Sequence, residues 1–209
     1  MIILTDNVRV AFKYRIQQSA RDGQVPLTIL REGRELEVAV PVVNDRPLVA
    51  PFLQGAYPRY FVHGPLVFSA VTQEFIAGFN NFALLNALTF AESPLVRRRV
   101  ERPAFAGEEL VVVAAPFFPH RLTKGYNNPA GRVVATINGT RPRNLGHLVE
   151  LLHAATSEFL EITFEGQGTE VLVFSRRELL DVTEDILSDN DVRARGTPDT
   201  LAIWANGEG

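Results

Sequence analysis

The stretch that decides the fold runs from Gly131 to Phe174 and reads GRVVATINGTRPRNLGHLVELLHAATSEFLEITFEGQGTEVLVF. It begins with a β-branched apolar run over residues 133–137, which predicts a short strand. Asn138 and Gly139 follow at once, and both residue types tolerate positive φ, so the dipeptide favours a tight turn.

A helix and a hairpin are predicted after this turn. Asn144 is suited to cap a helix that should end near Ala155, because apolar residues recur after it at the spacing of one helical face. These apolar residues are Leu145, Leu148, Val149 and Leu152. The segments 159–164 and 169–174 flank a glycine-containing turn at 166–168 and predict a β-hairpin. Strand, turn, helix and hairpin together indicate an α+β unit.

A shortened copy of this pattern occupies residues 6–43. Asp6 or Asn7 is suited to cap a helix, and Asp22-Gly23 should end it. The expected apolar face of this helix consists of Val8, Ala11, Phe12 and Ile16. Two predicted strands, residues 25–30 and 36–42, flank a turn at Glu32-Gly33. Because no strands precede the helix, the copy is either a fragment of a domain from a longer polypeptide, which we favour, or a partial unit that packs on a second domain.

The rest of the chain divides into a linker and a second set of elements. Residues 44–58 hold three prolines and no periodicity, which predicts an extended linker. The predicted elements that follow are strands on either side of Gly64-Pro65, one or two short helices within 73–102, a buried strand within 109–115, and an amphipathic helix over 177–187. A polar tail from Ser188 is expected to be mobile, with Leu201, Ile203 and Trp204 able to dock.

Composition limits the possible functions. The net charge of -3, with no basic tract longer than Arg97 to Arg99, argues against a nucleic-acid partner. The chain has no cysteine, and we find no long uncharged apolar run and no signal peptide, so no membrane partner is expected and the compartment stays open. No phosphate-binding loop occurs, and His63, His120, His147 and His153 are scattered, so neither a cofactor nor a metal site is expected. No serine lies in a motif typical of a catalytic nucleophile, so no catalytic residue is expected in this chain.

The order of short motifs resembles the C-terminal part of Deg/HtrA-family serine proteases, in the branch with two PDZ domains. The matching motifs are Val10 to Tyr14, Ile29 to Gly33, Tyr60-Phe61, Leu66 to Phe68, Val71-Thr72, Gly107 to Val111, Gly125-Tyr126, Ile137 to Gly139, Asn144 to Leu148 and Ser157 to Leu160. The resemblance implies a PDZ-like, partly open β-barrel or sandwich capped by helices. It also implies the end of a first PDZ domain over 1–43, a second over 59–175 with an insertion at 73–102, and a helix and tail over 176–209. The trypsin-like protease domain of that family would lie outside this chain.

This resemblance implies a peptide-binding groove. PDZ domains add an extended ligand to a strand beside a helix. Here the resemblance places the loop at Gly64 and Pro65, the receiving strand at Leu66, Val67 and Phe68, and the helix wall at Leu145, Leu148, Val149 and Leu152. Two of the four wall residues are expected to belong to the core instead. Pro65 stands where the family has a loop glycine, and it lacks the N–H that helps to hold a ligand carboxylate.

Three functions remain open at this point. The chain is expected to bind peptide segments or protein C-termini for a parent protease, or to join the protease domain or neighbouring subunits in a homo-oligomer, in a protein quality-control role. The alternative is a stand-alone PDZ-like adaptor or oligomerisation module. The apolar residues Phe75, Phe79, Phe82 and Phe90 are either a contact surface or part of the core.

Overall fold

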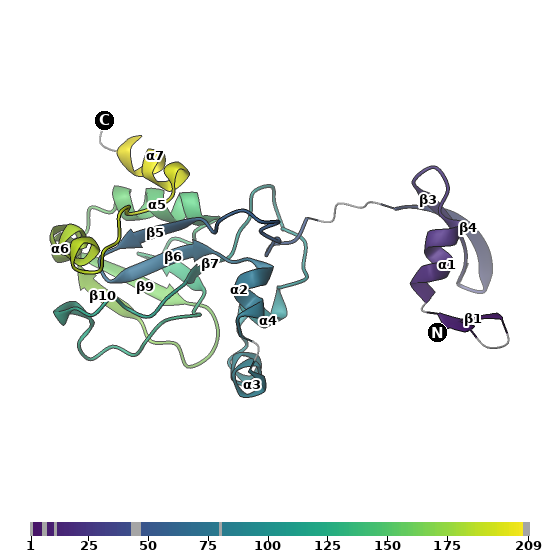
Figure 1. Ribbon diagram of the computed structural model, residues 1–209, viewed down its shortest axis with the longest axis horizontal. Helices are drawn as coiled ribbons and strands as arrows, with labels where there is room; N and C mark the ends of the chain where they lie inside the picture. Colours follow the sequence, from purple (N-terminus) through teal and green to yellow (C-terminus); the bar gives the residue numbers. More distant parts are fainter. Residues whose placement is uncertain (1, 6–7, 11, 43–46, 80, 207–209) are drawn as a thin grey trace. The chain divides into compact units, whose positions relative to one another are not determined.

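The computed structural model (Figure 1) describes residues 2–5, 8–10, 12–42, 47–79 and 81–206. The chain divides into two compact units, Met1–Arg46 and Pro47–Gly209. Every strand pairing between the named strands is antiparallel, and the described strands form open sheets that do not close into a barrel. The predicted α+β class with a partly open sheet arrangement is confirmed.

The first unit is built from two hairpins and a helix. Its elements are β1 Ile2–Thr5, β2 Val8–Val10, α1 Phe12–Ser19, β3 Gln24–Arg31 and β4 Arg34–Pro41. β1 pairs with β2, and β3 pairs with β4. The predicted turn at Glu32-Gly33 is confirmed, since φ is 53° and 77° at these residues, the positive values that a two-residue hairpin turn requires.

The start of the first predicted helix was wrong. Val8 lies in β2, where it pairs with Thr5 of β1, so local strand pairing of β-branched residues prevails over the helical spacing. The proposed cap residues Asp6 and Asn7, and Ala11 of the expected apolar face, lie outside the described residues.

The second unit contains two three-stranded sheets and six helices among the described residues. The elements are β5 Tyr60–His63, β6 Leu66–Ala70, α2 Gln73–Ala77, α3 Phe82–Phe90, α4 Pro94–Arg97, β7 Val111–Val113, the 3-10 turn η1 Arg121–Thr123, β8 Val134–Ile137, α5 Leu145–Ala154, β9 Phe159–Phe164, β10 Leu172–Ser175, α6 Arg176–Asp189 and α7 Pro198–Asn206. One sheet has the order β5-β6-β7 and the other β10-β9-β8. A single bridge between Val112 and Val133 brings the two sheets together.

The stretch that decides the fold behaves largely as its sequence predicts. Asn138 and Gly139 have φ of 46° and 76°, and the side chain of Asn144 accepts a hydrogen bond from the N–H of His147 at 2.8 Å. The predicted helix is α5 and the predicted closing strands are β9 and β10. β10 begins only at Leu172 because the preceding loop is held elsewhere. The carboxylate of Glu170, for example, accepts from the N–H of Asn127 at 2.9 Å.

Two apolar clusters form the core of the second unit. The larger lies between the two sheets and α5, and includes all four apolar residues of the α5 stripe. The smaller includes Val49 and Ala50, both fully buried, together with Ile76 of α2. Residues 49 and 50, within the segment expected to be a linker over 44–58, therefore belong to the core of the second unit. Burial of these apolar side chains, about 1.5 to 3 kcal/mol each, supplies most of the driving force for this packing.

The insertion and the tail are more structured than expected. Residues 73–102 contain three helices, α2, α3 and α4, where one or two were predicted. The predicted C-terminal helix is α6, and α7 follows it where a mobile tail was expected. In Figure 1, α7 lies beside α5, with which it makes extensive contacts. The alternative that Ile203 and Trp204 dock on the domain is confirmed, since both pack against the larger cluster.

Candidate functional site

The strand predicted to receive a ligand has no free edge. β6 pairs with β5 from Leu66 to Ser69, and with β7 from Phe68 to Ala70. The carbonyl of Val67 also accepts a hydrogen bond from the N–H of Ala114 at 2.7 Å. A peptide cannot add to a strand whose two edges are both paired. The expectation of a receiving strand at Leu66, Val67 and Phe68 is therefore corrected, because β6 is the central strand of this sheet and β5 forms its outer edge.

The turn at Gly64-Pro65 offers no donor to a ligand carboxylate. Gly64 has a φ of 54°, and its N–H donates to Oγ1 of the fully buried Thr183 at 2.9 Å. Pro65 has no N–H, and its carbonyl accepts from the N–H of Phe118. Gly64 does not supply the donor that Pro65 lacks, because Thr183 of α6 already accepts from the N–H of Gly64.

Gly64 also permits the close approach of α6. A Cβ added at this residue would lie 2.4 Å from Cδ2 of the fully buried Leu179. We expect Gly64→Ala to lower the free energy of unfolding by about 2 to 3 kcal/mol, from overpacking and the positive φ together. Urea denaturation measures this, with Gly168→Ala as the control. Gly168 also has a positive φ, of 65°, but nothing lies within 4 Å of its added Cβ. Equal losses in the two variants would contradict the packing role of Gly64.

The free edge of β5 is covered by the chain's own C-terminal segment, which we call the C-terminal strap, residues 195–206. The N–H of Val62 donates to the carbonyl of Arg195 at 2.7 Å, and the N–H of Thr197 donates to the carbonyl of Tyr60 at 3.1 Å. Phe61 and Gly196 form an antiparallel bridge between these bonds. The strap thus extends the β5-β6-β7 sheet as an added peptide would, and its α7 part then packs on α5.

An aromatic cluster holds the strap. The guanidinium of Arg195 lies 4.0 Å from the ring centroid of Trp204 and 5.0 Å from that of Phe61. Its Nη2 lies 2.8 Å from Nδ1 of His63. Since a guanidinium can only donate, Nδ1 accepts and the neutral imidazole carries its proton on Nε2. On the α5 side, the rings of His153 and Trp204 are in edge contact at 4.9 Å.

The surroundings of His63 keep its imidazole neutral. Burial, and then the positive charges of Arg195 and Arg176, lower its pKa from 6.5 to about 3. The His63 side chain is only 1% exposed, so protonation would place an unsolvated cation beside a guanidinium. The hydrogen bond from Arg195 therefore persists over the whole neutral range.

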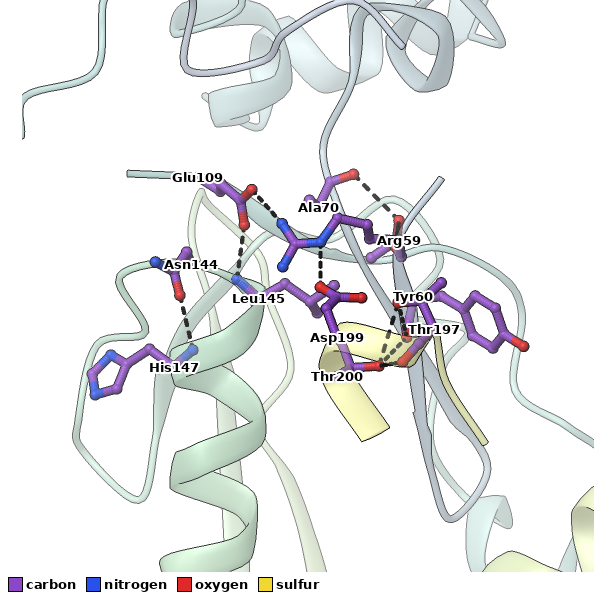
Figure 2. A network of polar contacts seen from close by, with 11 residues as sticks. Arg59, Tyr60, Ala70, Glu109, Asn144, Leu145, His147, Thr197, Asp199 and Thr200 are labelled. Carbon is purple, nitrogen blue, oxygen red and sulfur yellow. Dashed lines mark hydrogen bonds and ion pairs between the residues drawn. The ribbon is translucent and has the colours of Figure 1, made fainter. Parts of the chain in front are cut away.

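A polar network fixes the first turn of α7 within the strap (Figure 2). Arg59 donates to Asp199 at 2.6 Å through Nε, and to Glu109 at 2.7 Å through Nη1. The second oxygen of Glu109 accepts from the N–H of Leu145, at the first turn of α5. Burial alone raises the pKa of Asp199, but hydrogen bonds from Thr197 and Arg59 outweigh it and hold the pKa below its ordinary value. Because these ion pairs are about 40% exposed at Arg59, they contribute roughly 0.2 to 1 kcal/mol each and mainly position the strap.

The predicted helix wall is occupied as well. Leu145, Leu148, Val149 and Leu152 are all at most 2% exposed, so all four belong to the core where two were expected to. The face of α5 that is turned toward the strap presents Gly146 and His153. A Cβ at Gly146 would lie 2.9 Å from Cδ1 of Ile203, so this glycine permits the helices to approach.

The sequence pattern did not identify the two arginines that hold the strap. Arg59 and Arg195 carried no motif, because an exposed arginine and a stacked arginine look the same in sequence. Trp204, the one tryptophan of the chain, was the available signal, since a lone large aromatic in a polar tail usually has a surface to pack on.

The described residues offer neither a metal site nor a membrane-spanning helix. They contain no group of three or more His, Cys, Asp or Glu side chains suited to a metal ion. None of the described helices is long and apolar enough to span a membrane.

Comparisons with protein families and with known proteins identify relatives of this chain. The family model of the PDZ domain matches residues 50–199. The chain is 26% identical over 200 residues to Protease Do-like 2, chloroplastic, of Arabidopsis thaliana. The aligned region covers 95% of the chain and 31% of that protein. It is 27% identical over 169 residues to Protease Do-like 4, mitochondrial, of the same organism. This aligned region covers 80% of the chain and 29% of the relative. The chain thus spans about a third of the length of these relatives. It belongs to the PDZ domain family, and over most of its length its sequence is similar to part of these Do-like proteases.

Proposed function

We propose that this chain is the non-catalytic PDZ region of a Deg/HtrA-like serine protease and that it regulates or assembles that protease. The PDZ match and the likeness to Do-like proteases over most of the chain support this proposal. Residues 1–43 are then the end of a first PDZ-like domain, residues 59–175 a second one, and residues 176–209 its helix and tail. The parent polypeptide would be a trypsin-like serine endopeptidase that acts in protein quality control.

One observation supports this proposal most directly: the C-terminal strap occupies the edge of β5 and lies against α5. An external peptide that bound there would have to displace two backbone hydrogen bonds, worth about 1 kcal/mol each. It would also have to uncover Trp204, at roughly 2 to 3 kcal/mol. Displacement therefore weakens external binding by about 4 to 5 kcal/mol, or roughly a thousandfold or more. The favoured partners are accordingly the protease domain or neighbouring subunits, through outer surfaces of the region, rather than free protein C-termini.

This proposal predicts that the intact chain does not bind peptides through their C-terminal carboxylates. Fluorescence anisotropy should compare labelled peptides that end in Val or Leu, each with a free and an amidated C-terminus. We expect no saturable binding up to several hundred micromolar with either form, because Gly64 and Pro65 offer no free N–H and the β5 edge is covered. Micromolar binding that is lost on amidation would overturn the proposal and favour peptide capture.

The alternative is a stand-alone PDZ-like adaptor or oligomerisation module without a protease. It is separated from the leading proposal by the coding sequence upstream of Met1, which we expect to encode a trypsin-like domain. A stop codon there with no such domain would assign the chain to the adaptor class. In either case, we expect no hydrolysis of casein by this chain alone.

A further inference from the structure

We propose that helix α3 and the hollow beside it form the contact surface for a second copy of this chain. This inference rests on the proposed function and deepens it, because it names the partner and the residues through which a PDZ region would join subunits. The surface lies in the insertion at 73–102, away from the strap.

Helix α3 is apolar but uncovered. None of its residues is buried, and Phe82 and Phe90 at its two ends are 78% and 83% exposed. In Figure 1, α3 lies at the lower edge of the second unit, beyond α2 and α4. By contrast, Phe75 and Phe79 of the same insertion pack against the smaller core cluster. The four phenylalanines thus divide into two that belong to the core and two that are exposed to solvent.

A hollow of about 360 Å³ lies directly beside α3. Its lining includes Phe52, Ile76, Ala77 and Phe79 and is mostly apolar, and Leu85 of α3 contributes one side. Phe82 precedes Leu85 by three residues, so the two side chains lie on one face of the helix. Phe82 therefore projects next to the hollow, and the hollow is large enough to accept an aromatic ring.

A projection and a matching hollow on one surface favour a copy of the same chain as the partner. In a two-fold dimer the same patch meets itself, so Phe82 of each copy can enter the hollow of the other. Residues 75–91 carry no charge, so identical patches bring no like charges together at the dimer axis. Glu74 and Arg99, which also line the hollow, have opposite charges. The Glu74 carboxylate accepts from the N–H of Leu53 in its own chain, and two-fold symmetry allows it to face the guanidinium of the other copy as well.

The exposed area is sufficient for a modest interface. Phe52, Phe82 and Phe90 are 61%, 78% and 83% exposed, which leaves roughly 450 Å² of aromatic surface in contact with water. A standard stable interface buries about 800 Å² on each partner. Leu84 of α3, which is 41% exposed, adds to this area, and a patch below the standard size suits a weak, concentration-dependent dimer.

Sedimentation velocity of the full chain from 1 to 200 µM tests the proposal. We expect a monomer–dimer equilibrium, and we expect Phe82→Asp to raise its dissociation constant at least about thirtyfold, as for an interface hot spot. Val171→Asp is the matched control, since Val171 is an exposed apolar residue on a different loop, 46% exposed. Circular dichroism and thermal melting should show that both variants keep the native fold.

A cross-linking experiment then identifies the contact, and the chain favours it because it has no cysteine of its own. An oxidised mixture of Phe82→Cys and Ala77→Cys chains should give the mixed disulfide dimer in excess over either variant alone. Val171→Cys should give none with Ala77→Cys. A chain that stays monomeric at 200 µM, or a dimer that is indifferent to Phe82→Asp, overturns this inference but leaves the peptide test above unaffected. The inference is also overturned if the parent chain is monomeric and Phe82→Asp instead abolishes binding of a different protein.

Discussion

Replacing Trp204 by alanine will release the C-terminal strap and open the edge of β5. The indole stacks on Arg195 at 4.0 Å and contacts the ring of Phe61 at 5.2 Å, so its loss removes both the apolar burial and the cation–π contact that hold the strap. Truncation of a large aromatic at such a site costs about 3 kcal/mol. Hydrogen exchange of the Val62 and Thr197 amides should then accelerate roughly a hundredfold. These amides make the two backbone bonds between the strap and β5.

The same variant should gain affinity for added peptides. We expect saturable binding of an extended peptide, with or without a free carboxylate, because the donors missing at Gly64 and Pro65 do not return when the strap leaves. Tyr57→Ala is the control, since it removes an aromatic ring that is 93% exposed. A chain that ends at Asp191 should reproduce the gain without any substitution in the groove. Unchanged exchange at Val62 in both variants would show that the strap is not held by Trp204.

Local geometry was predictable because neighbouring residues determine it. The dipeptide Asn138-Gly139 forms the expected tight turn and Asn144 caps the expected helix, and both depend on conformations available within a few residues. Even here the start of β10 moved, because the loop before it contacts a segment distant in sequence, where Glu170 accepts from the N–H of Asn127. The failed helix start at Val8 has the same cause, since pairing with a neighbouring strand prevailed over helical spacing.

The candidate groove was less predictable because it depends on which segments meet. An apolar stretch such as Leu66 to Phe68 reads the same whether its strand is central or at an edge, and only the positions of β5 and β7 show that it is central. The apolar residues of α5 recur at the predicted helical spacing. All four belong to the core, however, whereas two of them were expected to face the groove. Nothing within α5 indicates that α7, some 50 residues later, covers its other face.

Acidification will destabilise the second unit through His63. The folded-state pKa of His63 is about 3, and its ordinary value is 6.5. The unfolded chain therefore binds a proton as the pH falls below about 6.5, while the folded chain does not. The stabilising contribution of neutral His63 is present in full above pH 6.5 and is lost progressively as the pH falls toward 3. By pH 4.5 the loss reaches about 3 kcal/mol, at 1.36 kcal/mol for each pKa unit. Urea denaturation at steps between pH 7.5 and 4.5 measures it.

His63→Gln separates this titration from those of the carboxylates. A glutamine oxygen can still accept the hydrogen bond from Arg195, but the side chain cannot take up a proton. We expect the variant to lose about 1 kcal/mol at pH 7.5, from imperfect packing, and to show a flatter stability profile down to pH 4.5. The two chains should therefore approach each other in stability, or cross, within that interval. His120→Gln is the control, because His120 is only half-buried and lies outside the core, where its Nδ1 accepts from the N–H of Leu122 in η1, a bond that a glutamine oxygen can also accept. Parallel profiles for His63→Gln and the parent chain would instead place the acid sensitivity elsewhere, and would mean that the Arg195–His63 contact tolerates a proton.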